Sequence, residues 1–210
     1  SLAHNGVMFL DELPEFDRKV LEVLREPLES GRITISRAAR QADFPARFQL
    51  IAAMNPCPCG YLGHTDNRCV CTSEQIERYR SKISGPLLDR IDMHVEVPNI
   101  ATQLLTEKSR NNDVTSSEIR IRVNNARVIQ LKRAPTPNNQ LTVKQITKWC
   151  ALKKADSSLL EEAIEALGLS ARAYHRILKV ARTIADLDEK ENIETKHLTE
   201  AITYRKFDRK

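Results

Sequence analysis

The sequence predicts an α/β region followed by an all-helical region, and three observations lead to this prediction. Short apolar runs typical of strands, such as VMFL and FQLIAAM, lie in the first half of the chain. After residue 100 the apolar residues follow helical spacing instead, and Pro98 closes the last predicted strand. We therefore expect two domains, at residues 1–100 and 101–210.

The α/β region is expected to begin with a short buried strand at residues 6–10. Pro14 suits the first turn of a helix, and Pro27 should stop or kink that helix. The apolar face of the helix would consist of Phe16, Val20, Val23 and Leu24.

Three further strands are predicted in the first half. Ile33 and Ile35 alternate with polar residues, which indicates a strand at residues 30–38, and residues 39–45 (ARQADFP) resemble a turn. Residues 48–54 (FQLIAAM) are typical of a fully buried strand, and residues 91–98 (IDMHVEVP) of a short one.

The second half begins with a capping-box signature, in which Thr115 precedes Glu118 by three residues. The apolar face of that helix would consist of Ile119, Val123, Ala126 and Ile129. Residues 134–140 (APTPNNQ) are expected to form a linker. Short helices should follow at 143–152 and 157–167, the second of them ended by Gly168.

Ser170 is a plausible N-cap for the longest helix, and Thr195 should open the last one. The apolar face of the longest helix would consist of Ala173, Ile177, Val180, Ile184 and Leu187.

Composition and charge narrow the function classes. No apolar run approaches the roughly 20 residues needed to cross a bilayer, so we expect no membrane partner. Residues 1–100 hold 12 Lys+Arg and 14 Asp+Glu (net −2), and residues 101–210 hold 21 and 14 (net +7), which together give the overall +5. A basic second half suits DNA or another polyanion, and equally a lysine-rich helical surface.

The chain has no initiating methionine, so we interpret it as a piece of a longer protein.

Two adjacent acids follow the first predicted strand. Asp11 could hold Mg²⁺ beside a nucleotide, and Glu12 could act as the general base that activates water. The pair could also simply open a loop. Asn55 ends the second buried strand at the same expected sheet edge, where open α/β sheets bind ligands.

Two arginines have the chemistry for a transferring phosphoryl group. Arg90 precedes the last predicted strand, and its planar guanidinium suits the charge that develops in phosphoryl transfer. Arg172 lies in the first turn of its helix, where a cation is electrostatically disfavoured, so a functional reason is plausible. Each could alternatively be a solvated arginine.

Four of the five cysteines lie within fifteen residues, as Cys57, Cys59, Cys69 and Cys71. Four thiolates can form a closed tetrahedral Zn²⁺ site, although C-x-C spacers are tighter than usual. Reduced thiols or a labile disulfide are the alternatives, and His64 could replace one ligand. Cys150 is expected in the helical core. Clustered thiols make the cytoplasm the default location.

The order of these motifs resembles the AAA+ ATPases of the magnesium-chelatase-like group. Four short motifs carry this likeness: DE after an apolar strand, then NP, LLDRID and LSARA. The stretches EPLESGRITISRAARQADFPARFQLIAAMNPCPCGY and SGPLLDRIDMHVEV are similar to its ComM (YifB) branch, and the similarity spans essentially the whole chain.

The resemblance implies a truncated AAA+ core with a β-hairpin insertion, followed by a helical lid. It makes Asp11 and Glu12 the Walker B pair and Asn55 sensor 1. Arg90 would be the arginine finger, acting on the ATP of a neighbouring subunit, and Arg172 would be sensor 2. Arg37 and Arg40 would lie near the tip of a hairpin that could grip DNA phosphates, although a solvated hairpin is equally plausible.

The function implied by the resemblance is an ATP-driven hexameric ring motor on DNA, similar to branch-migration helicases of natural transformation. No G-x-x-x-x-G-K-[ST] phosphate loop occurs in the sequence, so the chain alone should bind ATP feebly or not at all. A metal-insertion subunit of magnesium chelatase is one alternative. Another is a non-enzymatic helix-turn-helix module, with Arg172, Arg176 and Lys179 on one helix face.

Overall fold

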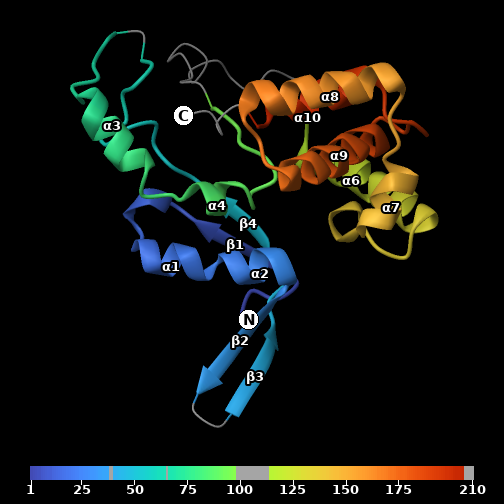
Figure 1. Cartoon of the computed structure of the whole chain (residues 1–210), viewed down its shortest axis with the longest axis horizontal. Coiled ribbons are helices and arrows are strands. Elements are labelled where there is room, and N and C mark those ends of the chain that lie inside the picture. The colour runs from blue at the N-terminus through green and yellow to red at the C-terminus, as the bar shows by residue number, and fades with distance from the viewer. Residues whose placement is uncertain (38–39, 65, 98–113, 206–210) are drawn as a thin grey trace. The chain divides into compact units, whose positions relative to one another are not determined.

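The computed structural model describes residues 1–37, 40–64, 66–97 and 114–205, with the side chains of residues 37 and 40 left out. The chain divides into two compact units, Ser1–Ile91 and Asp92–Lys210. The predicted boundary near residue 100 falls within residues 98–113, outside the described part. Figure 1 shows that the first unit contains the strands and the second unit is helical. The mixed α/β and helical classes predicted from the sequence are confirmed.

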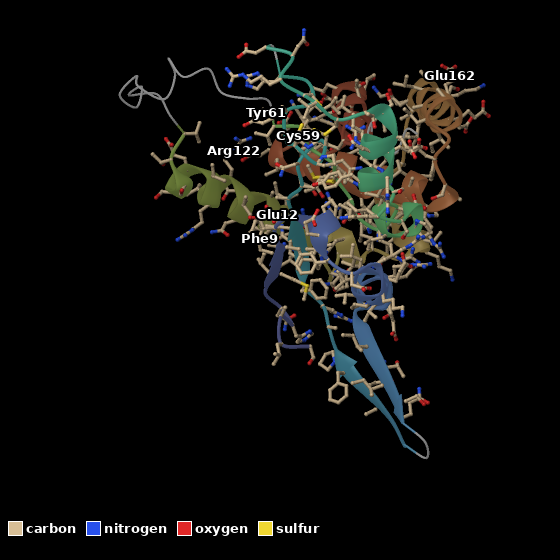
Figure 2. The ribbon with its side chains drawn as sticks, turned by 90° about the vertical axis from the view of Figure 1, so that its left-hand side faces the viewer. Phe9, Glu12, Cys59, Tyr61, Arg122 and Glu162 are labelled. Carbon is tan, nitrogen blue, oxygen red and sulfur yellow. The ribbon has the colours of Figure 1, made fainter. Side chains whose placement is uncertain are left out.

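The first unit is organised around a parallel strand pair. β1 (Val7–Leu10) pairs with β4 (Gln49–Ala52), with Val7 opposite Gln49 and Leu10 opposite Ala52. Both strands were expected to be buried, and this prediction was wrong: Phe9 is 60% exposed and Ile51 is 43% exposed. Figure 2 shows the exposed Phe9 ring. Phe9 and Ile51 are opposite each other in the strand register, so they lie on the same face of the pair, and the described residues leave that face largely exposed.

Two parallel strands require a crossover connection between them. Here the connection from β1 to β4 begins with helices. These are η1 (Leu13–Glu15), α1 (Arg18–Val23) and α2 (Arg25–Ser30). Asp17 caps α1 by accepting a hydrogen bond from the N–H of Lys19 at 2.7 Å. The helical run breaks at Leu24, three residues before Pro27, as predicted from the proline.

The predicted apolar face of the first helix was wrong in part: of its residues, Leu24 packs against the core of the first unit. Val20 and Val23 are exposed, and Leu21 is the buried residue of α1. Because the helix begins only at Arg18, after a separate 3-10 turn, its phase differs from that of a continuous helix. Leu21 packs with Leu13, Ile83 and Leu87 in the core of the first unit.

The crossover continues as an antiparallel hairpin, which projects from the rest of the unit in Figure 1. β2 (Arg32–Arg37) pairs with β3 (Arg40–Pro45), with Ile33 opposite Phe44 and Ile35 opposite Ala42. Residues 39–45 were expected to turn, but residues 40–45 form a strand instead. Backbone pairing with β2 outweighs the weak strand propensity of Gln, Ala, Asp and Pro.

Two helices after the cysteine-rich loop were missed in the sequence. α3 (Ser73–Arg80) begins with a capping box between Thr72 and Gln75, and α4 (Gly85–Leu88) is capped by Ser84. The strand predicted at residues 91–98 is absent from its described part, residues 91–97. The N–H of His94 donates to the carbonyl of Tyr204 at 2.8 Å, so this segment follows the helical unit instead of a sheet edge.

The second unit contains five α-helices and a short 3-10 turn among the described residues. They are α6 (Ser116–Arg133), η2 (Asn138–Gln140), α7 (Val143–Trp149), α8 (Lys154–Leu167), α9 (Ala171–Leu187) and α10 (Thr195–Thr203). The capping box at Thr115, the N-cap at Ser170 and the left-handed cap at Gly168 (φ 61°) confirm the predicted helix ends.

Helix α9 supplies the central stripe of this unit. Ala173 and Ile177 are buried as predicted, together with Leu178, Ala181 and Ala185. In α6, however, Ile119 and Val123 are each 49% exposed, so only part of its predicted face is buried. The expected linker at residues 134–140 also packs inward, because Asn138, which is 3% exposed, joins a buried polar network.

Asp186 is the centre of that network. It accepts hydrogen bonds from two nitrogens of Arg133 at 2.6 Å, from Asn138 at 2.8 Å and from Arg182 at 3.1 Å. Arg182 in turn donates to the carbonyls of Lys190 and Glu191. The network ties α6, η2 and α9 to the chain between α9 and α10. Among the described segments, no helix is long and apolar enough to cross a membrane.

Substitution of Asp186 should strongly destabilise the second unit. We expect Asp186→Ala to lower the free energy of unfolding by about 3–5 kcal/mol, because two buried guanidinium groups lose their counter-charge. Denaturant unfolding followed by fluorescence of Trp149, the single tryptophan, measures this. Glu162→Ala on exposed α8 surface is the control, and equal midpoints for both variants would contradict the assignment.

Candidate nucleotide site and cysteine cluster

The carboxyl ends of β1 and β4 bring polar side chains to one sheet edge. Beyond the strands, the N–H of Ala53 donates to Leu10 and the N–H of Leu13 donates to Ala53, both at 2.9 Å. These bonds hold the two outgoing segments side by side. Asp11 and Glu12 on one segment and Asn55 on the other therefore lie at the same edge, as the sequence predicts.

Glu12 has an unusual backbone conformation. Its φ and ψ are both 49°, in the left-handed region that a non-glycine residue adopts at a cost of roughly 1–2 kcal/mol. Its N–H donates to Oδ1 of Asp11 at 2.9 Å. The chain thus turns sharply from β1 into η1, with both carboxylates exposed at the turn (Figure 2 labels Glu12).

Tyr79 connects the two halves of this edge and was not anticipated from the sequence. Burial raises the pKa of its hydroxyl, a hydrogen bond with the Asn55 backbone lowers it, and the carboxylates of Glu15 and Glu12 raise it further, with a net increase. The residue is only 7% exposed. A local signal could have located the helix that carries Tyr79, because that helix begins with the capping box at Thr72.

Arg90 lies two residues after α4 and is buried, at 9% exposure. It forms an ion pair with Glu29, and its Nη1 donates to the carbonyl of Pro86 at 2.6 Å. The predicted arginine finger is therefore held by a carboxylate from α2 of its own chain. Glu29 was not singled out in the sequence.

Arg172 belongs to the second unit, where it is exposed in the first turn of α9. Two other basic residues of this helix bind within the unit. Arg176 forms an ion pair with Asp92, and Lys179 donates to the carbonyl of Asn139 at 3.0 Å. These contacts account for two of the three cations expected on a recognition helix.

Arg37 and Arg40 occupy facing positions at the tip of the β2–β3 hairpin. The structure describes only the backbone of these two residues. The backbone register is nevertheless defined, and it puts the two residues opposite one another at the end farthest from the Arg32–Pro45 pair.

The four clustered cysteines converge. Their Sγ atoms all lie within 4.8 Å of one another, and Cys57 is fully buried. Cys57 is 3.4 Å from Cys59, and both are 3.7 Å from Cys69. A tetrahedral site with Zn–S bonds of about 2.3 Å has sulfurs about 3.8 Å apart. The cluster therefore has the size of a Zn²⁺ site, and His64 is not part of it.

The thiols of the cluster differ in acidity. The backbone N–H of Tyr61 lowers the pKa of Cys59 to about 6, whereas burial raises the pKa of Cys71 to about 12. Four negative charges this close would repel one another, so a divalent cation is needed for all four cysteines to be thiolates at neutral pH. In Figure 2 sulfur atoms gather near Cys59.

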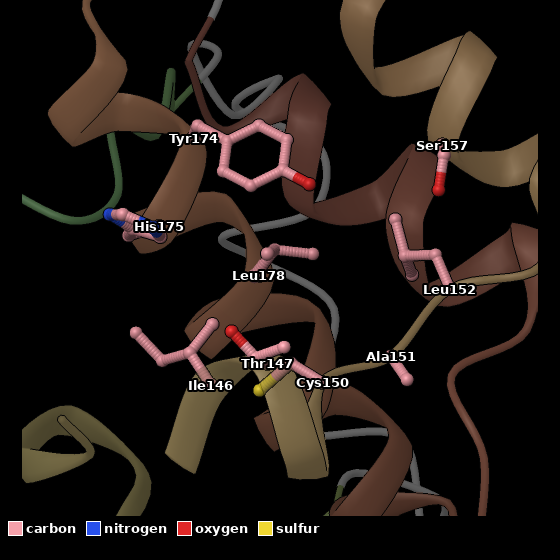
Figure 3. A pocket seen from close by; sticks show the side chains of 9 residues that line it. All are labelled: Ile146, Thr147, Cys150, Ala151, Leu152, Ser157, Tyr174, His175 and Leu178. Carbon is pink, nitrogen blue, oxygen red and sulfur yellow. The ribbon is translucent and has the colours of Figure 1, made fainter. Parts of the chain in front are cut away.

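A pocket of about 290 Å³ lies in the second unit (Figure 3). Its walls include Ile146, Leu178 and Tyr174, with Cys150 among them. Burial raises the pKa of Cys150 to about 11, so this thiol stays protonated and behaves as a core residue, as expected. The residues that line the pocket include no carboxylate and no cluster of metal ligands.

Comparison with known proteins identifies two consecutive family matches. The model described as magnesium chelatase, subunit ChlI, matches residues 1–105, and the model of the ChlI C-terminal region matches residues 113–205. The chain is 52% identical over 205 residues to competence protein ComM of Haemophilus influenzae, and 48% identical over 209 residues to the uncharacterized protein YifB of Escherichia coli.

These alignments cover 98% and 100% of the chain but 40% and 41% of the two relatives. The chain thus spans about two fifths of their length. A more distant relative is the zygotic DNA replication licensing factor mcm6 of Xenopus tropicalis, 30% identical over 92 residues, which are 44% of the chain and 10% of that protein.

Proposed function

Because the chain belongs to the magnesium-chelatase family, we propose that it forms part of an Mg²⁺-dependent ATPase. The observation that carries this proposal is the sheet edge shared by the Asp11–Glu12 turn and Asn55. Asp11 would bind Mg²⁺ through its carboxylate, Glu12 would polarise the attacking water, and the Asn55 amide would orient that water or a phosphate oxygen. The nucleotide itself supplies the phosphoryl group and brings the Mg²⁺.

We further propose that the ATPase works as a ring, hexameric by the resemblance, with the arginine finger Arg90 acting on a neighbour's nucleotide. To do so, Arg90 has to exchange the carboxylate of Glu29 for phosphate oxygens. Arg172 of the helical unit would supply the second guanidinium, as sensor 2. A cytoplasmic location fits a chain whose cysteines are free.

DNA is the substrate that we propose for the motor. The similarity to competence protein ComM and, more distantly, to a DNA replication licensing factor supports this class, and a branch-migration helicase is its most specific form. Arg37 and Arg40 at the hairpin tip would contact phosphates without reading bases.

Metal insertion into a porphyrin is the second candidate, since both matching family models are named for magnesium chelatase. Stimulation of ATP hydrolysis by DNA or by a porphyrin distinguishes the two. A non-enzymatic helix-turn-helix module has less support. Arg176 and Lys179 are engaged inside the helical unit and would have to give up those contacts to reach DNA.

Zn²⁺ is the metal that we propose for the cysteine cluster. Four thiolate ligands leave no open coordination position, so the ion would be structural and would take no part in hydrolysis.

The catalytic role of Glu12 is tested in a protein of the relatives' length that contains this chain. We expect Glu12→Gln to lower ATP turnover by about 10²- to 10⁴-fold, because the general base is lost. Binding of a fluorescent ATP analogue should stay unchanged. Glu15→Gln, three residues later and also exposed, is the matched control. Full turnover in Glu12→Gln would refute the assignment.

The hairpin is tested by DNA affinity at several salt concentrations. In the same long protein, Arg37→Ala with Arg40→Ala should weaken binding to all sequences alike and reduce the salt slope by about 0.7–0.9 for each lost phosphate contact. Arg32→Ala, at the hairpin base, serves as the control. An unchanged slope in the double variant would exclude these arginines from the DNA interface.

The metal is tested on the 210-residue chain. We expect one Zn²⁺ per chain by elemental analysis, and loss of most of it in Cys59→Ser, because three thiolates hold the ion less tightly than four. Cys150→Ser should keep the full metal content, since Cys150 lies in the helical core. A disulfide-linked, metal-free cluster would contradict this prediction.

A further inference from the structure

The cysteine cluster begins immediately beside the candidate catalytic amide. Cys57 follows Asn55 by two residues, and Pro56 between them has a restricted φ. Cys57 is fully buried, and its sulfur faces those of Cys59 and Cys69. A metal held by these sulfurs would therefore anchor the chain at most about 7 Å from the Cα of Asn55.

On its other side Asn55 is anchored by the sheet. The N–H of Ala53 donates to Leu10, and the carbonyl of Ala53 accepts from Leu13. Asn55 thus lies on a short bridge between β4 and the cysteine cluster. If only the end of this segment at β4 were fixed, Asn55 could change its orientation. Fixing the other end at Cys57 as well restricts that motion.

Helix α3 connects the cysteine cluster back to the segment that carries Asn55. Its N-cap Thr72 directly follows the last cysteine of the cluster, Cys71. Its last turn reaches back to the bridge, where Nε and Nη2 of Arg80 donate to the carbonyl of Pro56 at 3.2 and 3.1 Å. The Tyr79 hydroxyl is hydrogen-bonded to the backbone of Asn55.

The side chain of Asn55 also lies against the loop between the cysteines. A Cβ added to Gly60 would lie 4.0 Å from Cγ of Asn55, which is an ordinary van der Waals separation. Gly60 has a φ of 81°, a conformation suited to glycine, and its N–H donates to the carbonyl of Cys57 at 3.0 Å. The metal loop therefore lies beside the amide that hydrolysis would use.

We propose that the four-cysteine cluster, once loaded with Zn²⁺, positions Asn55 for ATP hydrolysis through Pro56 and the last turn of α3. The inference rests on the proposed ATPase function for its catalytic consequence. Arg80 and Tyr79 are positioning residues, which act on Asn55 and do not touch the nucleotide.

The first test needs no nucleotide. Amide hydrogen exchange of the 210-residue chain is measured with Zn²⁺ bound and after its removal by a chelator. We expect the Asn55 amide to exchange at least about tenfold faster without metal, as expected for local opening. The amide of Leu21, bonded to Asp17 in α1, should keep its rate and so exclude general unfolding of the unit. An unchanged Asn55 rate would overturn the proposal.

The second test is a double-mutant cycle on ATP turnover in a protein of the relatives' length. Arg80→Ala should keep one Zn²⁺ per chain and lower kcat about fivefold or more with KM unchanged. In the Asn55→Ala background the same substitution should have no further effect, because Arg80 acts through Asn55. Arg78→Ala, exposed in the same helical turn, is the control.

The outcomes separate the two proposals. If the wild type hydrolyses ATP and the effects of Arg80→Ala and Asn55→Ala multiply, the positioning proposal is wrong and the ATPase proposal stands. If the wild type shows no turnover that depends on Glu12, the ATPase proposal fails. The exchange rate of the Asn55 amide then still decides whether the metal orders this segment.

Discussion

The parallel pairing of β1 with β4 is the constraint on which the candidate site depends. Because the strands run in the same direction, the turn after Leu10 and the segment after Ala52 leave the sheet at one edge. The acid pair and Asn55 come together there although they are far apart in the sequence. The helices and the hairpin of the crossover are the connection that such a pair requires.

The cysteine-rich loop and α3 also contact the segment that follows β4 at this edge. Thr72 starts the helix directly after the last thiol, and Tyr79 and Arg80 return to the segment that carries Asn55. Catalytic groups act efficiently only when their supports hold them in one geometry. The short helix α3, together with the Zn²⁺ that we propose for the cysteine cluster, would provide such support with few residues, in a unit whose own apolar core is small.

The helical unit is held by a different principle. Its apolar core is larger, and the buried Asp186 draws two arginines and Asn138 into it. Buried charge of this kind contributes little net stability, but it penalises any arrangement that leaves one member unpaired. The network thus favours one arrangement of α6, η2 and the C-terminal part of α9.

Local chemistry in the sequence determined the two structural classes, the helix caps at Thr115 and Ser170, the stop at Gly168 and the four convergent cysteines, because each depends on neighbours a few residues away. The order of DE, NP, LLDRID and LSARA also indicated the family.

Only the tertiary structure decided which residues are buried and which side chains pair. Phe9 and Ile51 look like core residues but lie on a sheet face that the described residues leave exposed, and residues 40–45 became a strand because β2 was there to pair with them. The contacts of Arg90 with Glu29 and of Arg80 with Pro56 join segments far apart in the chain, and no local pattern encodes such distances.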